Sequence, residues 1–160
     1  MKNSLALYVH WPFCISKCPY CDFNSHVSEK PVVEARWRRA LLAELHYYAD
    51  RSNSEKPLSS IFFGGGTPST MEPETTAALI EAARSYWPNT KCLEISLEAN
   101  PTSVDASKLR DFAAAGVNRL SLGVQSFSDQ SLKFLGREHS AKEALAAIEL
   151  ASRNFKRYSF

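Results

Sequence analysis

Short apolar runs alternate with longer amphipathic stretches along most of the chain. The apolar runs predict four strands and the opening of a fifth, over Leu5–Val9, Leu58–Phe63, Cys92–Glu98, Asn118–Gly123 and Arg157–Phe160. The amphipathic stretches predict helices over Val33–Ala49, Glu72–Tyr86, Asp105–Ala115 and Ala141–Ser152. Pro73 suits the first turn of its helix, and Gly116 suits a helix stop. The pattern is therefore one of successive βα units.

Strand–helix alternation of this kind predicts a parallel sheet, either open or closed into a barrel. In such folds the functional loops follow the carboxyl ends of the strands. Four of the predicted strands end at unusual residues, namely a cysteine loop, Gly64–Gly66, Glu98 and Gln125. Because these strand ends meet at one edge of the sheet, we expect one site there.

The chain is too short for a closed barrel of this type. A complete (β/α)₈ barrel takes ~250 residues, whereas this chain has 160. An incomplete barrel would leave an unpaired strand edge. We therefore predict an α/β fold, a partial TIM-like barrel of about four and a half βα units, and the N-terminal piece of a longer protein.

Composition and charge exclude several classes of function. The chain is 44% hydrophobic and 22% charged, and its net charge is +2, which predicts neither nucleic acid nor an anionic membrane as main partner. No apolar run approaches the ~20 residues of a membrane span, and the N-terminus lacks a signal-peptide cleavage site. The four cysteines indicate metal or thiol chemistry rather than disulfides, and hence a cytoplasmic location.

The loop after the first predicted strand contains three closely spaced cysteines, Cys14, Cys18 and Cys21. A 4Fe–4S cluster normally takes one thiolate per iron, so three cysteines would leave one iron open to a small molecule. A structural zinc site is the alternative, with a fourth ligand from His10, His26 or Cys92. We expect Cys92 instead to pack as a small apolar residue in its strand.

The spacing CxxxCxxC after a first strand, with Gly64-Gly65-Gly66-Thr67-Pro68 after the second, resembles the radical S-adenosylmethionine (SAM) proteins. In that family the open iron binds the amino and carboxylate groups of SAM, and the reduced cluster cleaves SAM to a 5′-deoxyadenosyl radical. Glycines allow a ligand to approach the main chain closely. The resemblance implies a 4Fe–4S cluster and SAM as cofactors, and residues 1–160 as the incomplete N-terminal part of a radical SAM core domain.

Further motifs narrow the resemblance to one branch of the family. They are the runs YVHWPFC, CPYC, GGGTP, EANP, GVQSF and LGREHS, in that order. This set resembles the branch that contains oxygen-independent coproporphyrinogen III oxidase and the HemW group of heme chaperones. The matched positions imply the metal ligands Cys14, Cys18 and Cys21 and the cofactor contacts Tyr8, Tyr20, Gly65, Gly66, Thr67, Glu98, Gln125 and Arg137. Positions matching Gly66, Thr67, Gln125 and Arg137 contact a second SAM molecule in the oxidase.

The residue two positions after the third cysteine distinguishes the two members of this branch. The oxidase has a further cysteine there, whereas this chain has Phe23, which favours a heme chaperone. The resemblance then implies heme as a ligand, an electron donor of the flavodoxin or ferredoxin type, and an apo-heme-protein recipient, either membrane-associated or not. The alternative is an oxygen-independent coproporphyrinogen III dehydrogenase that acts on a porphyrinogen. A plain electron-transfer protein would not explain Glu98 and Gln125 at the strand ends.

The chain has four histidines, and Trp37 lies in the first predicted helix. His10 ends a strand and either packs there or contacts a porphyrin or heme. His26 and His139 are expected in loops, with no assigned role. Trp37 and His46 are expected to pack on the first predicted helix.

Overall fold

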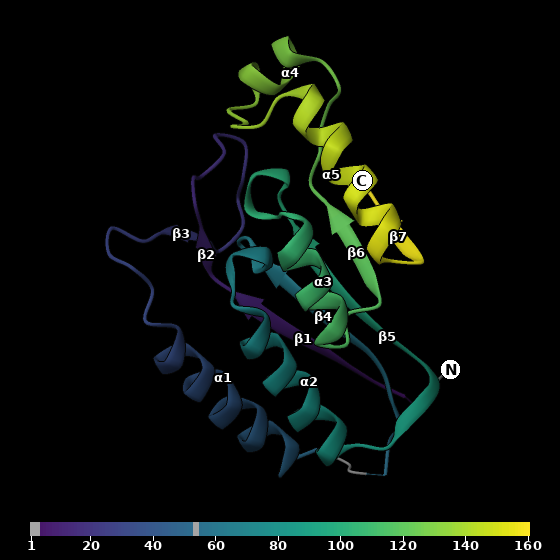
Figure 1. The fold of residues 1–160 in the computed structure, drawn as a ribbon. Coiled ribbons are helices and arrows are strands. Elements are labelled where there is room, and N and C mark those ends of the chain that lie inside the picture. Colours follow the sequence, from purple (N-terminus) through teal and green to yellow (C-terminus); the bar gives the residue numbers. More distant parts are fainter. Residues whose placement is uncertain (1–3, 53–54) are drawn as a thin grey trace.

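A computed structural model describes residues 4–52 and 55–160 (Figure 1). One sheet contains five parallel strands in the order β1-β4-β5-β6-β7. These strands span Leu5–Trp11 (β1), Leu58–Gly65 (β4), Asn89–Ala99 (β5), Arg119–Leu122 (β6) and Arg157–Ser159 (β7). A parallel sheet in chain order is the arrangement of a barrel segment, so the predicted α/β barrel-like fold is confirmed.

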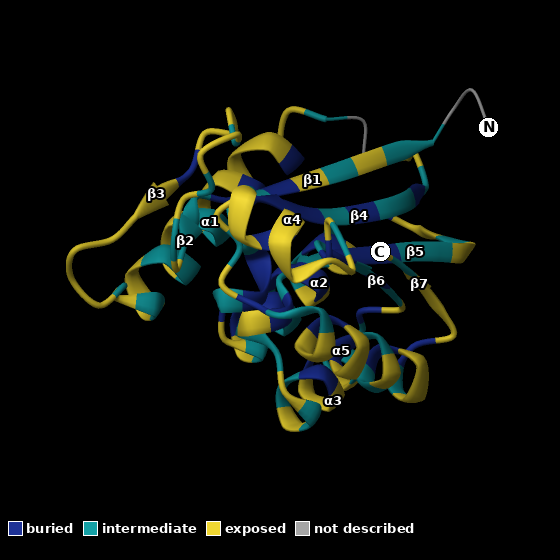
Figure 2. Ribbon diagram, turned by 90° about the horizontal axis from the view of Figure 1, so that it is seen from above, coloured by how far each residue is buried: buried dark blue, intermediate teal, exposed yellow. Residues whose placement is uncertain are grey.

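Helices cover one face of this sheet (Figure 2). They are α1 (Glu34–Ala49), α2 (Pro73–Tyr86), α3 (Ala106–Ala114) and α5 (Ala141–Asn154). A short helix, α4 (Asp129–Phe134), lies at the carboxyl end of the sheet (Figure 1). Two 3₁₀ turns, Pro68–Thr70 and Pro101–Ser103, follow β4 and β5. All four predicted helices are therefore present.

Alternation along the strands explains why one face is covered and the other is not. The side chains that point toward the helices are apolar and buried, namely Val9, Trp11, Ile61, Phe63, Ile95, Leu97, Leu120 and Leu122. Each fully buried side chain of this kind contributes roughly 1.5–3 kcal/mol. The intervening positions, including Glu98 and Ser121, face the opposite side, so one face holds the core and the other can carry chemistry.

The predicted helix ends are confirmed. Pro73 lies in the first turn of α2, where its missing N–H would have no helical partner. Gly116 follows α3 with φ 109°, and the next residue, Val117, donates its N–H to the carbonyl of Phe112. This left-handed glycine and backward hydrogen bond end the helix in the manner of a Schellman motif.

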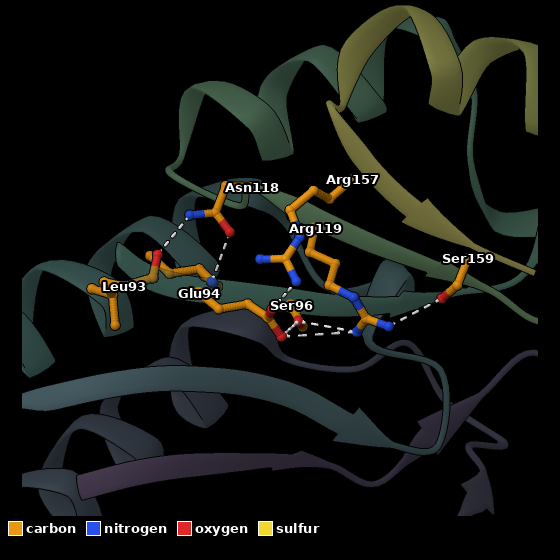
Figure 3. A network of polar contacts seen from close by, with 8 residues as sticks. Leu93, Glu94, Ser96, Asn118, Arg119, Arg157 and Ser159 are labelled. Carbon is orange, nitrogen blue, oxygen red and sulfur yellow. Dashed lines mark hydrogen bonds and ion pairs between the residues drawn. The ribbon is translucent and has the colours of Figure 1, made fainter. Parts of the chain in front are cut away.

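A polar network ties β5, β6 and β7 together on the open face (Figure 3). Glu94 forms ion pairs with Arg119 at 4.0 Å and with Arg157 at 2.6 Å. Arg119 also donates to Ser96 and Ser159, each at 3.3 Å. Because Arg119 and Arg157 are directly opposite each other in register, the carboxylate of Glu94 offsets a repulsion between neighbouring strands.

Two side-chain expectations from the sequence are wrong in detail. Cys92 is exposed rather than packed, because Leu58 pairs with Asn89 and Ser60 with Glu94, which leaves Cys92 in the irregular stretch between them. His46 is also exposed, although its Nδ1 lies 3.1 Å from the Tyr86 hydroxyl of α2. Trp37 packs as expected, with its ring edge-on to Phe13 at 4.9 Å. The hydrophobic pattern did not predict α4 or the small sheet formed by β2 (Phe13–Cys14) and β3 (His26–Val27).

Candidate functional site

The carboxyl ends of the strands surround a cavity of about 290 Å³. Two candidate site residues, Tyr8 and Gly65, do not line this cavity. The others do, and they are Cys14, Cys18, Tyr20, Cys21, Gly66, Thr67, Glu98, Gln125 and Arg137. These residues come from loops that are far apart in the sequence and meet because the strands are parallel. The expectation of one site at this edge is therefore met.

The glycines bring the cysteine loop against the end of β4. Gly66 donates its N–H to the carbonyl of Trp11 at 2.6 Å, and Thr67 donates to that of Phe13 at 2.8 Å. A Cβ on Gly66 would lie 2.7 Å from the Phe13 carbonyl oxygen, so only glycine permits this approach. Gly65 adopts φ 111°, and its N–H donates to Glu98.

The cysteine loop is held at several points of its main chain. Lys17 donates from Nζ to the carbonyl of Ser25 at 3.1 Å, and His10 donates from Nε2 to the carbonyl of Asn24 at 2.9 Å. The backbone N–H of Cys21 donates to the carbonyl of Cys18 at 3.0 Å. His10 thus helps to hold the backbone of the cysteine loop.

Two of the three thiols receive side-chain hydrogen bonds. Thr67 donates from Oγ1 to the sulfur of Cys14 at 3.3 Å, and Arg137 donates from Nη1 to that of Cys18 at 3.2 Å. Donors and positive charge at this distance stabilise a thiolate, which is the form that binds metal. Within residues 4–52 and 55–160, no three His, Cys, Asp or Glu side chains converge on a single-ion position. Three cysteine thiols are the donor type that a 4Fe–4S cluster takes, whereas a structural zinc site needs a fourth ligand.

Glu98 faces the cavity without a cationic partner among the described residues. Burial raises the pKa of the Glu98 carboxyl, and the hydrogen bond from the Gly65 N–H only partly opposes this. The carboxylate therefore retains acceptor capacity for an ammonium group or for hydroxyls of a ligand.

Tyr8 lies beside the cavity rather than in its lining. It is 56% exposed, and its ring stacks on that of Phe62 with the centroids 6.0 Å apart. Its hydroxyl lies 3.5 Å from Nδ1 of His10. Burial raises the pKa of Tyr8, with a smaller contribution from the charge of Glu98. Tyr8 is thus close enough to Glu98 to sense its charge.

Arg137 is a structural link as well as a cavity residue. Its Nη2 donates to the carbonyl of Gly123 at 2.7 Å, while its Nη1 reaches Cys18. Its Nε is buried and has no hydrogen-bond partner among the described residues. Tyr20 lies beside this pair, and burial raises the pKa of its phenol more than the charge of Arg137 lowers it. Arg137 is not an ordinary surface arginine.

Gln125 has an unusual backbone. It is the only non-glycine residue with positive φ in the described part of the chain, at 69°. The N–H of Ser126 donates to the carbonyl of Val124 at 2.9 Å, so Gln125 is the centre of a classic γ-turn. Such conformations cost on the order of 1–3 kcal/mol and persist only where the surroundings hold them.

Sequence reasoning missed two kinds of residue at this site. His139, expected in a loop without a role, is buried and donates from Nε2 to the Val124 carbonyl at 3.0 Å. Asn100, Ser121 and Lys17 also line the cavity. Asn100 directly follows the end of β5, Lys17 directly precedes a cysteine, and Ser121 lies within β6, but these residue types are common on any surface.

The comparisons with known proteins identify a family. A model of the radical SAM superfamily matches residues 8–160. The mitochondrial radical S-adenosyl methionine domain-containing protein 1 of Bos taurus is 47% identical over 150 residues, and the heme chaperone HemW of Escherichia coli is 43% identical over 148. These alignments cover 94% and 92% of this chain, but only 34% and 39% of those proteins.

A solved structure agrees with these relatives. The structure of coproporphyrinogen III oxidase (HemN) from Escherichia coli, a radical SAM enzyme, superposes on this chain with a TM-score of 0.86 at 29% identity. The alignment covers 98% of this chain and 36% of that one. This chain therefore spans between a third and two fifths of the length of the proteins that it matches.

The sequence predicted no membrane-spanning segment. No helix within the described residues is both long and apolar enough to cross a bilayer.

Proposed function

The chain belongs to the radical SAM superfamily, and we propose that Cys14, Cys18 and Cys21 hold a 4Fe–4S cluster with SAM beside it in the cavity. When bound and reduced, the cluster would supply the electron for reductive cleavage of SAM, while the protein supplies position and electrostatics. The donor set supports this assignment, because three thiols line one cavity and two of them accept side-chain hydrogen bonds.

The remaining cavity residues would bind and orient SAM. Glu98 would accept hydrogen bonds from the ammonium group or the ribose hydroxyls of SAM, because it has no cationic partner within residues 4–52 and 55–160. Gly65 and Gly66 would let SAM approach the main chain, and Tyr20 would pack on its adenine. Tyr8 would contribute from the adjacent face. Gly66, Thr67, Gln125 and Arg137 are the candidates for a second SAM molecule.

We further propose that the protein acts as a heme chaperone. The observation that carries this proposal is Phe23, which lines the cavity and is 58% exposed. With Tyr20, 49% exposed, it gives the mouth of the cavity an apolar aromatic rim suited to a flat macrocycle. The HemW relative of Escherichia coli is named a heme chaperone. Cluster and SAM would then control the transfer of heme to an apo-heme-protein in the cytoplasm, after reduction by a flavodoxin-type or ferredoxin-type donor.

The second candidate is an oxygen-independent coproporphyrinogen III dehydrogenase. The superposition with the solved HemN structure supports it. In such an enzyme a 5′-deoxyadenosyl radical would take one hydrogen atom from each of two propionate side chains of coproporphyrinogen III. Loss of carbon dioxide would leave a vinyl group, and one electron per propionate would pass to an electron acceptor. Phe23 argues against it, because the oxidase has a cysteine at the matching position.

One experiment separates the two candidates. The intact protein is reconstituted anaerobically with iron and sulfide, supplied with reductant, SAM and coproporphyrinogen III, and assayed for carbon dioxide and protoporphyrinogen. In parallel, hemin is added, and its Soret band is followed before and after mixing with an apo-heme-protein. We expect heme binding and transfer without carbon dioxide. Multiple turnovers to protoporphyrinogen would contradict the chaperone proposal.

A further inference from the structure

The turn after β6 is held by a histidine that no cofactor role explains. Gln125 lies at its centre with φ 69°, a conformation that side-chain-bearing residues rarely adopt. The carbonyl of Val124 accepts the hydrogen bond that closes the turn, from Ser126, and accepts a second from His139 Nε2 at 3.0 Å. The same oxygen therefore closes the turn and anchors it to a distant segment.

His139 is itself rigidly placed. Only 3% of its surface is exposed. It immediately precedes Ser140, which caps α5 through a reciprocal capping box with Glu143. The N–H of Ala141 also donates to the carboxylate of Asp129, at the start of α4, at 2.7 Å. A buried donor on a doubly anchored segment is suited to positioning another group, since it has little freedom of its own.

The residues just before His139 contact the cysteine loop. Gly136 adopts φ 65°, and a Cβ there would lie 2.6 Å from Cδ of Pro19 in the cysteine loop. Arg137 reaches the sulfur of Cys18 and the carbonyl of Gly123. One segment, 136–139, thus connects the cysteine loop to the turn that carries Gln125.

We propose that His139 is a positioning residue that holds the γ-turn at Gln125, and through it the Gln125 side chain, in the geometry that receives SAM. The inference rests on the proposed function insofar as SAM is the ligand. His139 itself does not line the cavity, so any effect on binding must pass through the turn.

The test compares two replacements of His139 in the intact protein. His139→Leu removes the donor at similar size, whereas His139→Gln places an amide N–H near the position of Nε2. Amide hydrogen exchange of residues 122–128, measured without cofactors, reports the turn. Equilibrium dialysis of SAM against the anaerobically reconstituted protein reports the site. His46→Leu, at an exposed histidine of α1, is the matched control.

We expect faster exchange in residues 122–128 and about tenfold weaker SAM binding for His139→Leu, the effect of losing one hydrogen bond. His139→Gln should keep slow exchange and bind SAM within about threefold of the wild type. Adding His139→Leu to Gln125→Ala should weaken SAM binding by less than about twofold, because the pathway through Gln125 is already lost. If His139→Leu does not fold, His139→Asn replaces it as the variant that lacks the hydrogen bond, since its shorter amide cannot reach the Val124 carbonyl.

Two results would overturn the inference. One is unchanged exchange and unchanged SAM affinity in a folded variant that lacks the donor. The other is a failure of His139→Gln to rescue either readout. If the wild-type protein binds no SAM at all, the proposed function fails instead, and the exchange measurement alone decides whether His139 holds the turn.

Discussion

Two glutamates on the same face of β5 differ in how their charge is balanced. Glu94 lies at the middle of the strand and forms ion pairs with Arg119 and Arg157 (Figure 3). Glu98, four positions further along, faces the cavity and has no cationic partner among the described residues. Its nearest compensation is one backbone N–H, from Gly65, and burial raises its pKa.

The difference separates a structural carboxylate from one that is free to bind a ligand. Glu94 neutralises two arginines that lie opposite each other on β6 and β7, so it contributes to strand order. Glu98 keeps an uncompensated negative charge in a partly desolvated place, which is costly unless a cation or donor arrives. SAM carries both an ammonium and a sulfonium group, so it has the positive charge that would balance the Glu98 carboxylate.

The largest predicted effect concerns the cysteines at the two ends of the sheet. Replacement of Cys14, Cys18 or Cys21 by Ala should reduce the iron content of the reconstituted protein to near zero and abolish the cluster absorbance, because each thiolate holds one iron. Cys92→Ala, at the amino end of β5, is the matched control and should leave both unchanged. Full iron content in any of the first three variants would refute the ligand assignment.

The next effect concerns the structural carboxylate. Glu94→Gln should destabilise the protein by about 1–3 kcal/mol, because two opposed arginines lose a partly buried counter-charge. Thermal unfolding should show a melting temperature lower by roughly 2–4 °C per kcal/mol. Glu149→Gln, which breaks the exposed pair with Arg153 on α5, is the control and should change stability by less than about 0.5 kcal/mol. Equal losses of stability in both variants would mean that the Glu94 network stabilises the protein no more than an exposed ion pair does.

The ionised carboxylate of Glu98 should instead destabilise the folded protein at neutral pH. Its folded pKa lies above the ordinary value of 4.5, so the folded protein binds the proton more tightly than the unfolded chain. Its contribution to stability therefore becomes less favourable as pH rises from that value through the folded pKa. Glu98→Gln should raise the cofactor-free stability at pH 7 and remove this part of the pH dependence. Denaturant melts from pH 4 to pH 8 check this, and a destabilised Glu98→Gln variant would contradict it.

The smallest effect is on a neighbouring phenol. The charge of Glu98 contributes to the raised pKa of Tyr8, after burial. Glu98→Gln should therefore lower the pKa of Tyr8 slightly, whereas Glu94→Gln should leave it unchanged. NMR titration of tyrosine-labelled protein, with Tyr8→Phe to assign the signal, measures this shift. An equal shift in both variants would show that Tyr8 does not distinguish the two carboxylates.

The sequence predicted the helices and strands of this fold better than the contacts between them. Strand–helix alternation and the strand-end positions of Glu98 and Gln125 sufficed to predict the sheet and the edge that carries the site. The contacts made across the chain could not be predicted in this way. The hydrogen bond between Arg137 and Cys18 joins residues 119 positions apart, and the burial of His139 depends on how α4 and α5 pack. Cys92 was misjudged because an irregular pairing of β4 and β5, invisible in the pattern, exposes it.

The most direct test is the affinity for SAM of two matched variants, Glu98→Gln and Glu94→Gln, each anaerobically reconstituted and measured by equilibrium dialysis beside the wild type. We predict at least about tenfold weaker binding for Glu98→Gln, because a charge-assisted hydrogen bond is lost. Glu94→Gln should bind within about twofold of the wild type, because its charge is already balanced inside the protein. Equal affinities for the two variants, or weaker binding by Glu94→Gln, would contradict the assignment of Glu98 to the ligand.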